Sequence, residues 1–244
     1  LGLAVQAYSK RAMPVLEWLA ALAEATGRKL PVRLVKGAYW DTEVKRAQER
    51  GLDGYPVFTR KAATDASYLA CARQMLNARP TLFPQFATHN ALTVATIMEM
   101  AGADKTGFEF QRLHGMGETL YKSVTEGGDK IACRIYAPVG GYRDLLAYLV
   151  RRLLENGANT SFVHSFLDDD VSPEIVAADP ITRMFLRVCD ATCPTASPVT
   201  SPSAFSLSAI FSAILSIILR YRTILREGSV RRTISFWTSA NGTM

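Results

Sequence analysis

Strand-like and helix-like segments alternate strictly over the first two thirds of the chain. Each short apolar run is followed by a run whose apolar residues recur three and four positions apart, and this pair of patterns occurs five times. The expected strands are residues 1–8, 31–39, 83–89, 108–114 and 131–137, and the expected helices are 12–26, 41–54 with 59–78, 91–101, 117–128 and 142–156. Such alternation is typical of an α/β fold with a parallel sheet, either doubly wound or part of a barrel.

Local signals agree with this interpretation. Gly27 is placed to end the first helix, and Asn90 is placed to cap the helix that begins at Ala91. The GxGxxG fingerprint does not follow any expected strand, which argues against a dinucleotide-binding Rossmann fold.

The composition changes abruptly near Pro180. Residues 183–244 contain seven arginines and two acidic residues, whereas the preceding part is nearly neutral. We therefore divide the chain into a domain at 1–180 and a Ser/Arg-rich tail at 181–244. The tail is interpreted as disordered, as an amphipathic helix on a membrane surface, or as translated sequence unrelated to the domain, and the abrupt shift favours the last. Its apolar stretch, 205–219, is shorter than the roughly 20 residues that span a bilayer.

Four cysteines without a CxxC pair indicate neither a disulfide framework nor a zinc knuckle, and they favour a reducing compartment. The three histidines lie on separate expected elements, so no metal site is expected. Because Leu1 already lies in an apolar run and is not Met, we expect the chain to begin within a domain.

The segment from Arg33 to Trp40 combines a buried strand pattern with two cations, Arg33 and Lys36. Burying a cation requires a partner, and Gly37 with the small Ala38 leaves room for a ligand beside two aromatic side chains. The segment is either the ligand-facing end of a strand or an edge strand with two solvated cations.

Polar side chains recur where the expected strands end, which is where parallel α/β folds bind ligands. They are Gln6, Arg33 with Lys36, Thr88-His89-Asn90, Gln111 with His114, and Arg134 with Tyr136.

Two adjacent arginines, Arg151 and Arg152, interrupt the apolar helix 142–156. Arg151 could pair with Glu155 on the helix surface. Two guanidinium groups close together could instead bind a carboxylate or phosphate, and we favour this interpretation.

Five motifs in order resemble the proline dehydrogenase domain of the bifunctional proline utilization A flavoproteins of bacteria. They are RLVKGAYW at 33–40, FATHNA at 86–91, FQRLHGMG at 110–117, RIYAPVG at 134–140 and YLVRRLLENGANTSF at 148–162. The resemblance covers about residues 1–180. It implies a distorted (β/α)8 TIM-like barrel that holds FAD, of which this chain carries the C-terminal five βα units, strands four to eight.

The resemblance also implies roles for individual residues. Tyr39, Leu113, Tyr136, Arg151 and Arg152 correspond to substrate-binding residues, with the arginines on the proline carboxylate. The catalytic set is Arg33, near flavin N5, with Tyr136, Arg151, Arg152 and Glu155. Expected FAD contacts are Gln6, Arg33, Val35, Gly37, Ala38, Trp40, Thr59, Arg60, Lys61, Thr88, His89, Asn90, Gln111, Glu155, Thr160, Ser161 and Phe162.

The implied reaction is FAD-dependent oxidation of L-proline to 1-pyrroline-5-carboxylate, the first step of proline catabolism to glutamate, with electrons passed to a quinone. The implied parent protein is cytoplasmic and peripheral at the inner face of the bacterial membrane, with a homo-oligomer possible and no nucleic acid bound by this segment. The family's catalytic lysine and aspartate from earlier strands have no counterpart here, so we expect a fragment with little activity alone.

Two other functions stay open at this point. Lys36 at a strand end could form a Schiff base, as in barrel lyases. The basic tail could make the chain a non-catalytic module that binds membranes or nucleic acid.

Overall fold

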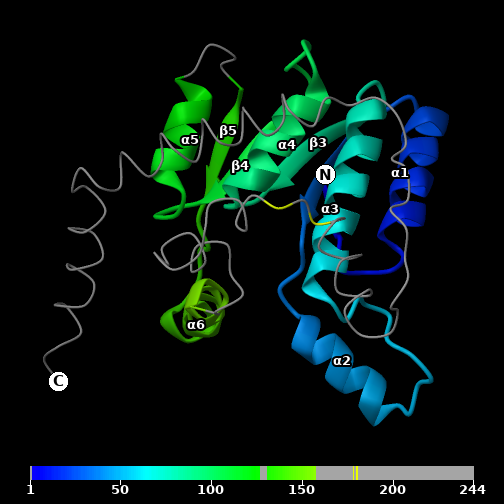
Figure 1. Ribbon diagram of the computed structural model, residues 1–244, viewed down its shortest axis with the longest axis vertical. Coiled ribbons are helices and arrows are strands. Elements are labelled where there is room, and N and C mark those ends of the chain that lie inside the picture. The colour runs from blue at the N-terminus through cyan, green and yellow to red at the C-terminus, as the bar shows by residue number, and fades with distance from the viewer. Residues whose placement is uncertain (1, 127–130, 158–177, 179, 181–244) are drawn as a thin grey trace, which may run out of the picture.

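The computed structural model describes residues 2–126, 131–157, 178 and 180 of the 244-residue chain. Strands and helices alternate as expected, with the two expected helices between the second and third strands (Figure 1). The elements are β1 (Leu3–Gln6), α1 (Ala12–Thr26), β2 (Leu30–Val35), α2 (Trp40–Glu49), α3 (Lys61–Asn77), β3 (Leu82–Ala87), α4 (Ala91–Ala101), β4 (Glu109–Leu113), α5 (Glu118–Thr125), β5 (Cys133–Tyr136) and α6 (Tyr142–Gly157).

The five strands form one parallel sheet in the order β1-β2-β3-β4-β5. This confirms the α/β class with a parallel sheet. Because β2 lies between β1 and β3, the alternative that Arg33 and Lys36 belong to an edge strand is wrong.

The second strand ends at Val35, four residues before the expected end at Tyr39. Gly37 adopts φ 122°, a backbone conformation that side chains with a Cβ rarely adopt and that breaks the extended run. A Cβ on this residue would lie 1.5 Å from the Tyr8 ring, so Gly37 also lets that ring approach the backbone. The expectation that Gly37 leaves this space for a ligand is therefore wrong, because the Tyr8 ring occupies it.

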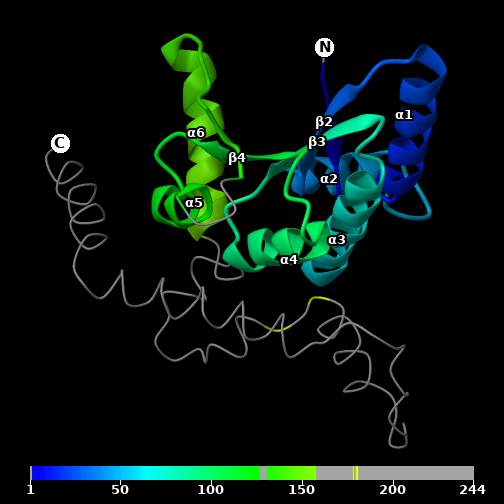
Figure 2. The same ribbon diagram turned by 90° about the horizontal axis from the view of Figure 1, so that it is seen from above.

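One face of the sheet packs on the helices and forms the core. Val32, Leu34, Phe86 and Phe110 are fully buried there, and the ring centroids of Phe86, Phe108 and Phe110 lie 5.7–6.1 Å apart. Figures 1 and 2 show α3 and α4 against this face. Alternate residues of β2 and β3, together with Phe110 of β4, therefore supply the apolar core.

The opposite face, called the open face below, carries the intervening residues and is largely polar. The strand register places Arg33 of β2, Gln85 of β3 and Glu109 of β4 in one row. It also places Gln111 of β4 beside Arg134 of β5. The open face is therefore the part of the sheet that can meet a polar ligand.

Both helix-end predictions are confirmed. Gly27 follows α1 in the left-handed conformation with φ 61°, and the side chain of Asn90 accepts a hydrogen bond from the Thr93 backbone N–H at 3.1 Å.

Two helices lie beyond the carboxyl ends of the strands. Figure 1 shows α2 and α6 below the sheet, whereas α1, α3, α4 and α5 lie beside the strands. In the described part of the chain, no helix combines the length and the apolar character that crossing a membrane requires.

Candidate functional site

Lys36 has the partner that its burial requires. Its ammonium group forms an ion pair with Asp65 on α3, and the other oxygen of that carboxylate lies 2.9 Å from the Lys61 Nζ. Burial lowers the pKa of Lys36, and Asp65 opposes that effect. Burial raises the pKa of Asp65, but the two lysines outweigh it and leave that pKa below its usual value. Sequence reasoning missed Asp65, although its spacing of four from Lys61 was visible.

Arg33 points to the open face and stacks on an aromatic ring. Its guanidinium carbon lies 4.2 Å from the centre of the Tyr136 ring. Its Nε is buried and has no hydrogen-bond partner among the described residues. A buried donor of this kind usually finds an acceptor, so the site suits a ligand that brings one.

His89 is held as a neutral imidazole. Its Nε2 accepts a hydrogen bond from the Leu113 backbone N–H at 3.0 Å, so the proton lies on Nδ1. Burial, with the positive charges of Arg112, Arg152 and Arg33, lowers the pKa of His89 to about 4. At neutral pH His89 is therefore an uncharged hydrogen-bond donor.

The loop around His89 is fixed on both sides. The Tyr121 hydroxyl donates to the Thr88 carbonyl at 2.7 Å, and the Asn90 N–H donates to the Thr88 side-chain oxygen at 3.2 Å. These bonds place Thr88, His89 and Asn90 at the carboxyl end of β3, as the sequence predicted.

The residues that follow Gly37 present aromatic surface. The side chains of Tyr39 and Trp40 are 50% and 42% exposed. The Trp40 indole N–H donates to the Phe58 carbonyl at 2.8 Å, which fixes the ring at the start of α2. Two exposed but oriented rings suit a flat ligand.

Helix α6 contacts the start of α2 through Arg151. Its guanidinium stacks 4.4 Å from the centre of the Tyr39 ring, donates a hydrogen bond to the Ala38 carbonyl, and lies 3.5 Å from the Asp41 carboxylate. This contact brings the last described helix to the carboxyl end of β2.

Arg152 takes a different direction from Arg151. Its guanidinium carbon lies 5.2 Å from the centre of the Tyr148 ring, one turn earlier on α6. Burial raises the pKa of the Tyr148 hydroxyl, and the neighbouring Tyr136 adds to this effect. Tyr148 is a member of this cluster that sequence reasoning did not single out.

A buried carboxylate joins three strands on the open face. Glu109 is 4% exposed and receives two hydrogen bonds from Arg134, at 2.8 and 2.9 Å. Gln85 and Gln111 donate to the same carboxylate at 2.8 and 2.9 Å. Arg134 and Gln111 were expected at this end of the sheet, whereas Gln85 and Glu109 were not.

Other expected residues fall near this cluster or outside it. Gln6 and Val35 are neighbours across β1 and β2, and Leu113 and Tyr136 are neighbours across β4 and β5. Thr59 and Arg60 are exposed residues just before α3, and Lys61 begins it. His114 is exposed and contributes no described contact to the cluster's side chains. The side chain of Glu155, together with Thr160, Ser161, Phe162 and the tail, lies outside the described residues.

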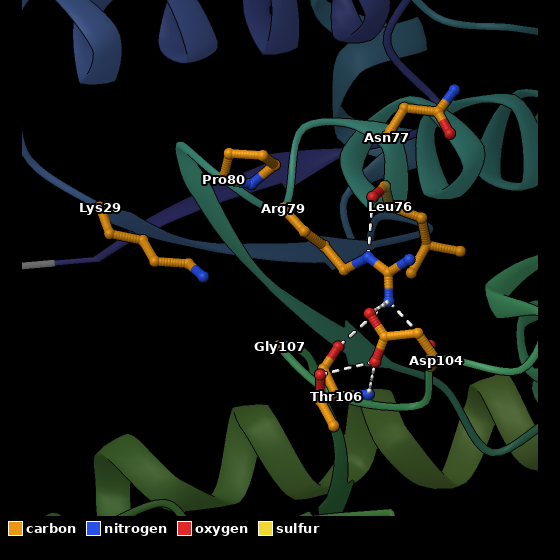
Figure 3. A pocket seen from close by; sticks show the side chains of 8 residues that line it. All are labelled: Lys29, Leu76, Asn77, Arg79, Pro80, Asp104, Thr106 and Gly107. Carbon is orange, nitrogen blue, oxygen red and sulfur yellow. Dashed lines mark hydrogen bonds and ion pairs between the residues drawn. The ribbon is translucent and has the colours of Figure 1, made fainter.

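A surface pocket of about 550 Å³ lies at the other end of the sheet, where β2, β3 and β4 begin (Figure 3). Arg79 points across it and donates to the carbonyls of Leu76, Asp104 and Thr106 at 3.0, 2.8 and 3.2 Å. These internal hydrogen bonds occupy the arginine. The cluster at the carboxyl ends of the strands is therefore the better candidate site.

The site thus combines a cation, a neutral donor and exposed rings. Arg33 brings positive charge with an unmet donor, His89 brings an N–H, and Tyr39 with Trp40 brings flat apolar surface. Such residues can hold a flat aromatic group that carries hydrogen-bond acceptors, and they can stabilise negative charge that develops on it.

Comparison with known proteins gives a consistent result. The family model described as proline dehydrogenase matches residues 1–165. The bifunctional protein PutA of Escherichia coli K12 is 55% identical over 188 residues, which cover 75% of this chain and 14% of that protein. Proline dehydrogenase of Deinococcus radiodurans is 33% identical over 135 residues, or 54% of this chain and 38% of that protein. This chain therefore spans about a seventh of the length of the bifunctional relative.

Solved structures agree. A crystal structure of a Bradyrhizobium japonicum PutA variant matches with a TM-score of 0.71 and 60% identity, over 79% of this chain and 21% of that one. PutA of Bdellovibrio bacteriovorus matches with a TM-score of 0.69 and 39% identity, over 75% and 19%.

Proposed function

The chain belongs to the proline dehydrogenase family, and on this premise we propose that it supplies the carboxyl-terminal half of a site that oxidises L-proline to 1-pyrroline-5-carboxylate with FAD. The observation that carries this proposal is the placement of Arg33. Its guanidinium lies against Tyr136 on the open face, with a buried Nε that lacks an acceptor among the described residues.

The residues present fit a flavin. Arg33 offers a cation, His89 offers a neutral N–H, and Trp40 offers an exposed flat ring. In the proposal these residues hold the cofactor together with Gln6, Val35, Thr59, Arg60, Lys61, Thr88, Asn90, Gln111, Glu155 and Phe162. Bound FAD supplies the acceptor for the hydride that leaves the proline ring.

Arg33 has an electrostatic role in this proposal. A fixed guanidinium beside a ring that gains electrons stabilises the negative charge of the reduced form. Stacking on Tyr136 fixes this charge without neutralising it. Arg33 therefore favours the transfer of hydride away from the substrate.

The substrate is held by residues of two elements at the carboxyl ends of the strands. Arg151 and Arg152 on α6 bind the proline carboxylate, because guanidinium groups form strong charge-assisted bonds with carboxylates. Tyr39, Leu113 and Tyr136 surround the ring, and Glu155 orders the arginines. The support for this arrangement is the contact of Arg151 with Ala38 and Tyr39, which brings α6 over the strand ends.

The remaining parts of the proposal concern the longer parent protein. In this proposal the cytoplasmic parent would pass electrons to a quinone at the inner face of the bacterial membrane, where it would associate peripherally and could form a homo-oligomer. This segment binds no nucleic acid. These statements rest on the family alone.

The chain alone is proposed to bind FAD weakly. Strands β1 and β5 each have one unpaired edge in the described sheet, and Val15, Trp18 and Leu22 of α1 are 39%, 62% and 37% exposed. A (β/α)8 barrel closes its sheet and covers such surfaces. The chain therefore acts as part of a barrel whose other strands complete the site.

The Schiff-base alternative has no structural support. The ammonium group of Lys36 is engaged by Asp65, so its nitrogen is not free to attack a carbonyl. The alternative based on the basic tail concerns residues outside the described part, and the family match favours an oxidoreductase.

The test uses a fusion in which the upstream barrel segment of Bradyrhizobium japonicum PutA precedes this whole chain, called the completed barrel below. Addition of L-proline without oxygen should bleach the flavin absorbance and form a product that reacts with o-aminobenzaldehyde. Pyrrolidine, which lacks the carboxylate, should bleach it far more slowly. A bound flavin that proline does not reduce would overturn the proposed function.

A further inference from the structure

Glu109 is the most buried acidic side chain of the described residues, and it lies in the middle of the open face. Its Oε1 accepts hydrogen bonds from Gln85, Gln111 and the Arg134 Nε at 2.8, 2.9 and 2.8 Å. Its Oε2 accepts a hydrogen bond from the Arg134 Nη2 at 2.9 Å. The residues come from β3, β4 and β5, so one carboxylate ties three strands together.

The carboxylate dictates how Gln111 is oriented. An ionised carboxylate can only accept hydrogen bonds, so the NH₂ group of Gln111 must face it. Burial raises the pKa of Glu109, but the hydrogen bonds from Arg134 and Gln111 outweigh it and keep that pKa below its usual value. Because an amide is rigid and planar, the carbonyl oxygen of Gln111 then points away from Glu109.

Gln111 is itself buried, with 6% of its surface exposed, and no donor among the described residues bonds its carbonyl oxygen, which is therefore a directed acceptor. It lies at the register position next to Arg134, two pairs before Leu113 and Tyr136 at the carboxyl end of the sheet. A ligand that covers this part of the open face must therefore bring a hydrogen-bond donor.

We propose that Glu109 is a positioning residue that fixes Gln111 as an acceptor for the N3–H of the flavin ring. This inference rests on the proposed FAD-dependent function and names the contact by which the site recognises the ring. An oxidised isoalloxazine has a single ring N–H, at N3, so an acceptor directed at the ring has one donor to meet. In this proposal Glu109 determines which end of the Gln111 amide, the NH₂ group or the carbonyl oxygen, faces the ligand.

A purely structural role for Glu109 gives a different expectation. If the carboxylate only neutralised Arg134, the side chains of the pair could be removed without changing what Gln111 recognises. Arg134→Met leaves Glu109 to accept from both glutamines, whereas Glu109→Gln places a second amide against Gln111 and frees it to rotate. The two variants therefore separate orientation from charge balance.

The experiment measures the dissociation constants of FAD and of 3-methyl-FAD, which lacks the N3–H, for the completed barrel. The native sequence should bind 3-methyl-FAD about tenfold or more weakly than FAD, since a buried acceptor loses its donor. In Glu109→Gln the ratio of the two dissociation constants should fall to about threefold or less, whereas Arg134→Met and the exposed Glu99→Gln should leave that ratio unchanged. The bulk of the methyl group is common to all variants, so the change in ratio reports the hydrogen bond.

Each outcome decides the inference. Equal affinity of the native sequence for the two cofactors overturns it without any variant, and so does an unchanged ratio in folded Glu109→Gln. If Glu109→Gln does not fold, Gln111→Leu takes its place and should lower the ratio in the same way, with an unchanged ratio counting against the inference. Failure of the completed barrel to bind FAD at all would instead overturn the proposed function.

Discussion

The guanidinium carbon of Arg151 lies 4.4 Å from the centre of the Tyr39 ring. Arg151 belongs to the last described helix and Tyr39 to the turn that follows the second strand, so the contact joins distant parts of the chain. The hydrogen bond from Arg151 to the Ala38 carbonyl lies beside it. Together they hold α6 over the carboxyl end of the sheet, where the proposed substrate site lies.

Removal of the Tyr39 ring should weaken proline binding. A cation–π contact contributes roughly 0.5–2 kcal/mol, so Tyr39→Leu should raise the KM for proline by about 2- to 30-fold in the completed barrel. Tyr39→Phe keeps the ring and should stay within about twofold. Steady-state kinetics with a dye acceptor measures both. Equal KM values for the two variants would show that stacking on Arg151 does not position the arginine.

Loss of the second arginine should affect the substrate more than the cofactor. A charge-assisted hydrogen bond contributes roughly 1.5–3 kcal/mol, so Arg152→Met should raise the KM for proline by about tenfold or more. The exposed Arg143→Met on the same helix is the matched control. If Arg152→Met shifts KM by less than about twofold relative to this control, Arg152 does not bind the carboxylate.

We expect the neutral state of His89 to make the free energy of unfolding depend on pH. Its pKa is about 4 in the folded protein and about 6.5 in an unfolded chain. As the pH falls, the unfolded state therefore binds the proton before the folded state does. The stability that neutral His89 contributes is complete above about pH 6.5 and is lost as the pH falls toward 4, which lowers the free energy of unfolding by about 1–3 kcal/mol.

Urea unfolding of the FAD-free completed barrel between pH 4 and pH 7 measures this dependence. The free energy of unfolding should depend less steeply on pH in His89→Gln than in the native sequence. The exposed His114→Gln should keep the native pH dependence. A steeper slope in His89→Gln than in the native sequence would contradict the neutral assignment.

Asp65 should stabilise the fold through Lys36. Asp65→Asn leaves the buried ammonium without a counter-charge, but Lys36 retains 28% of its side-chain exposure, which limits the cost. We expect a loss of about 1–3 kcal/mol in the free energy of unfolding, compared with near zero for the exposed Asp53→Asn. A loss equal to that of the control would mean that solvent replaces Asp65.

The alternation of strand and helix patterns was sufficient to predict the parallel sheet, and the residues Gly27 and Asn90 were sufficient to predict the two helix ends. It did not give the end of β2, because that end depends on the positive φ of Gly37 and on the Tyr8 ring beside it. Both depend on tertiary packing, which strand periodicity does not report.

The site residues show the same division. The sequence pattern, which buries two cations, correctly predicted that Lys36 has a partner. It did not identify Asp65, because Asp65 lies on a helix whose rotation relative to the sheet cannot be derived from local sequence. Glu109 was visible as a polar position in an alternating strand. Its role became apparent only when the register placed Gln85 and Arg134 beside it. Arg151 and Arg152 were predicted together, yet neighbours on a helix point about 100° apart, and the structure gives them different rings.

The most direct test of the central claim compares this chain alone with the completed barrel. Both are purified in the presence of FAD, and retained flavin absorbance and proline-dependent dye reduction are measured at equal protein concentration. We predict stoichiometric flavin and proline oxidation in the completed barrel, and little of either in the 244-residue chain. A completed barrel that holds flavin but does not oxidise proline, or equally strong activity from the chain alone, would contradict the account.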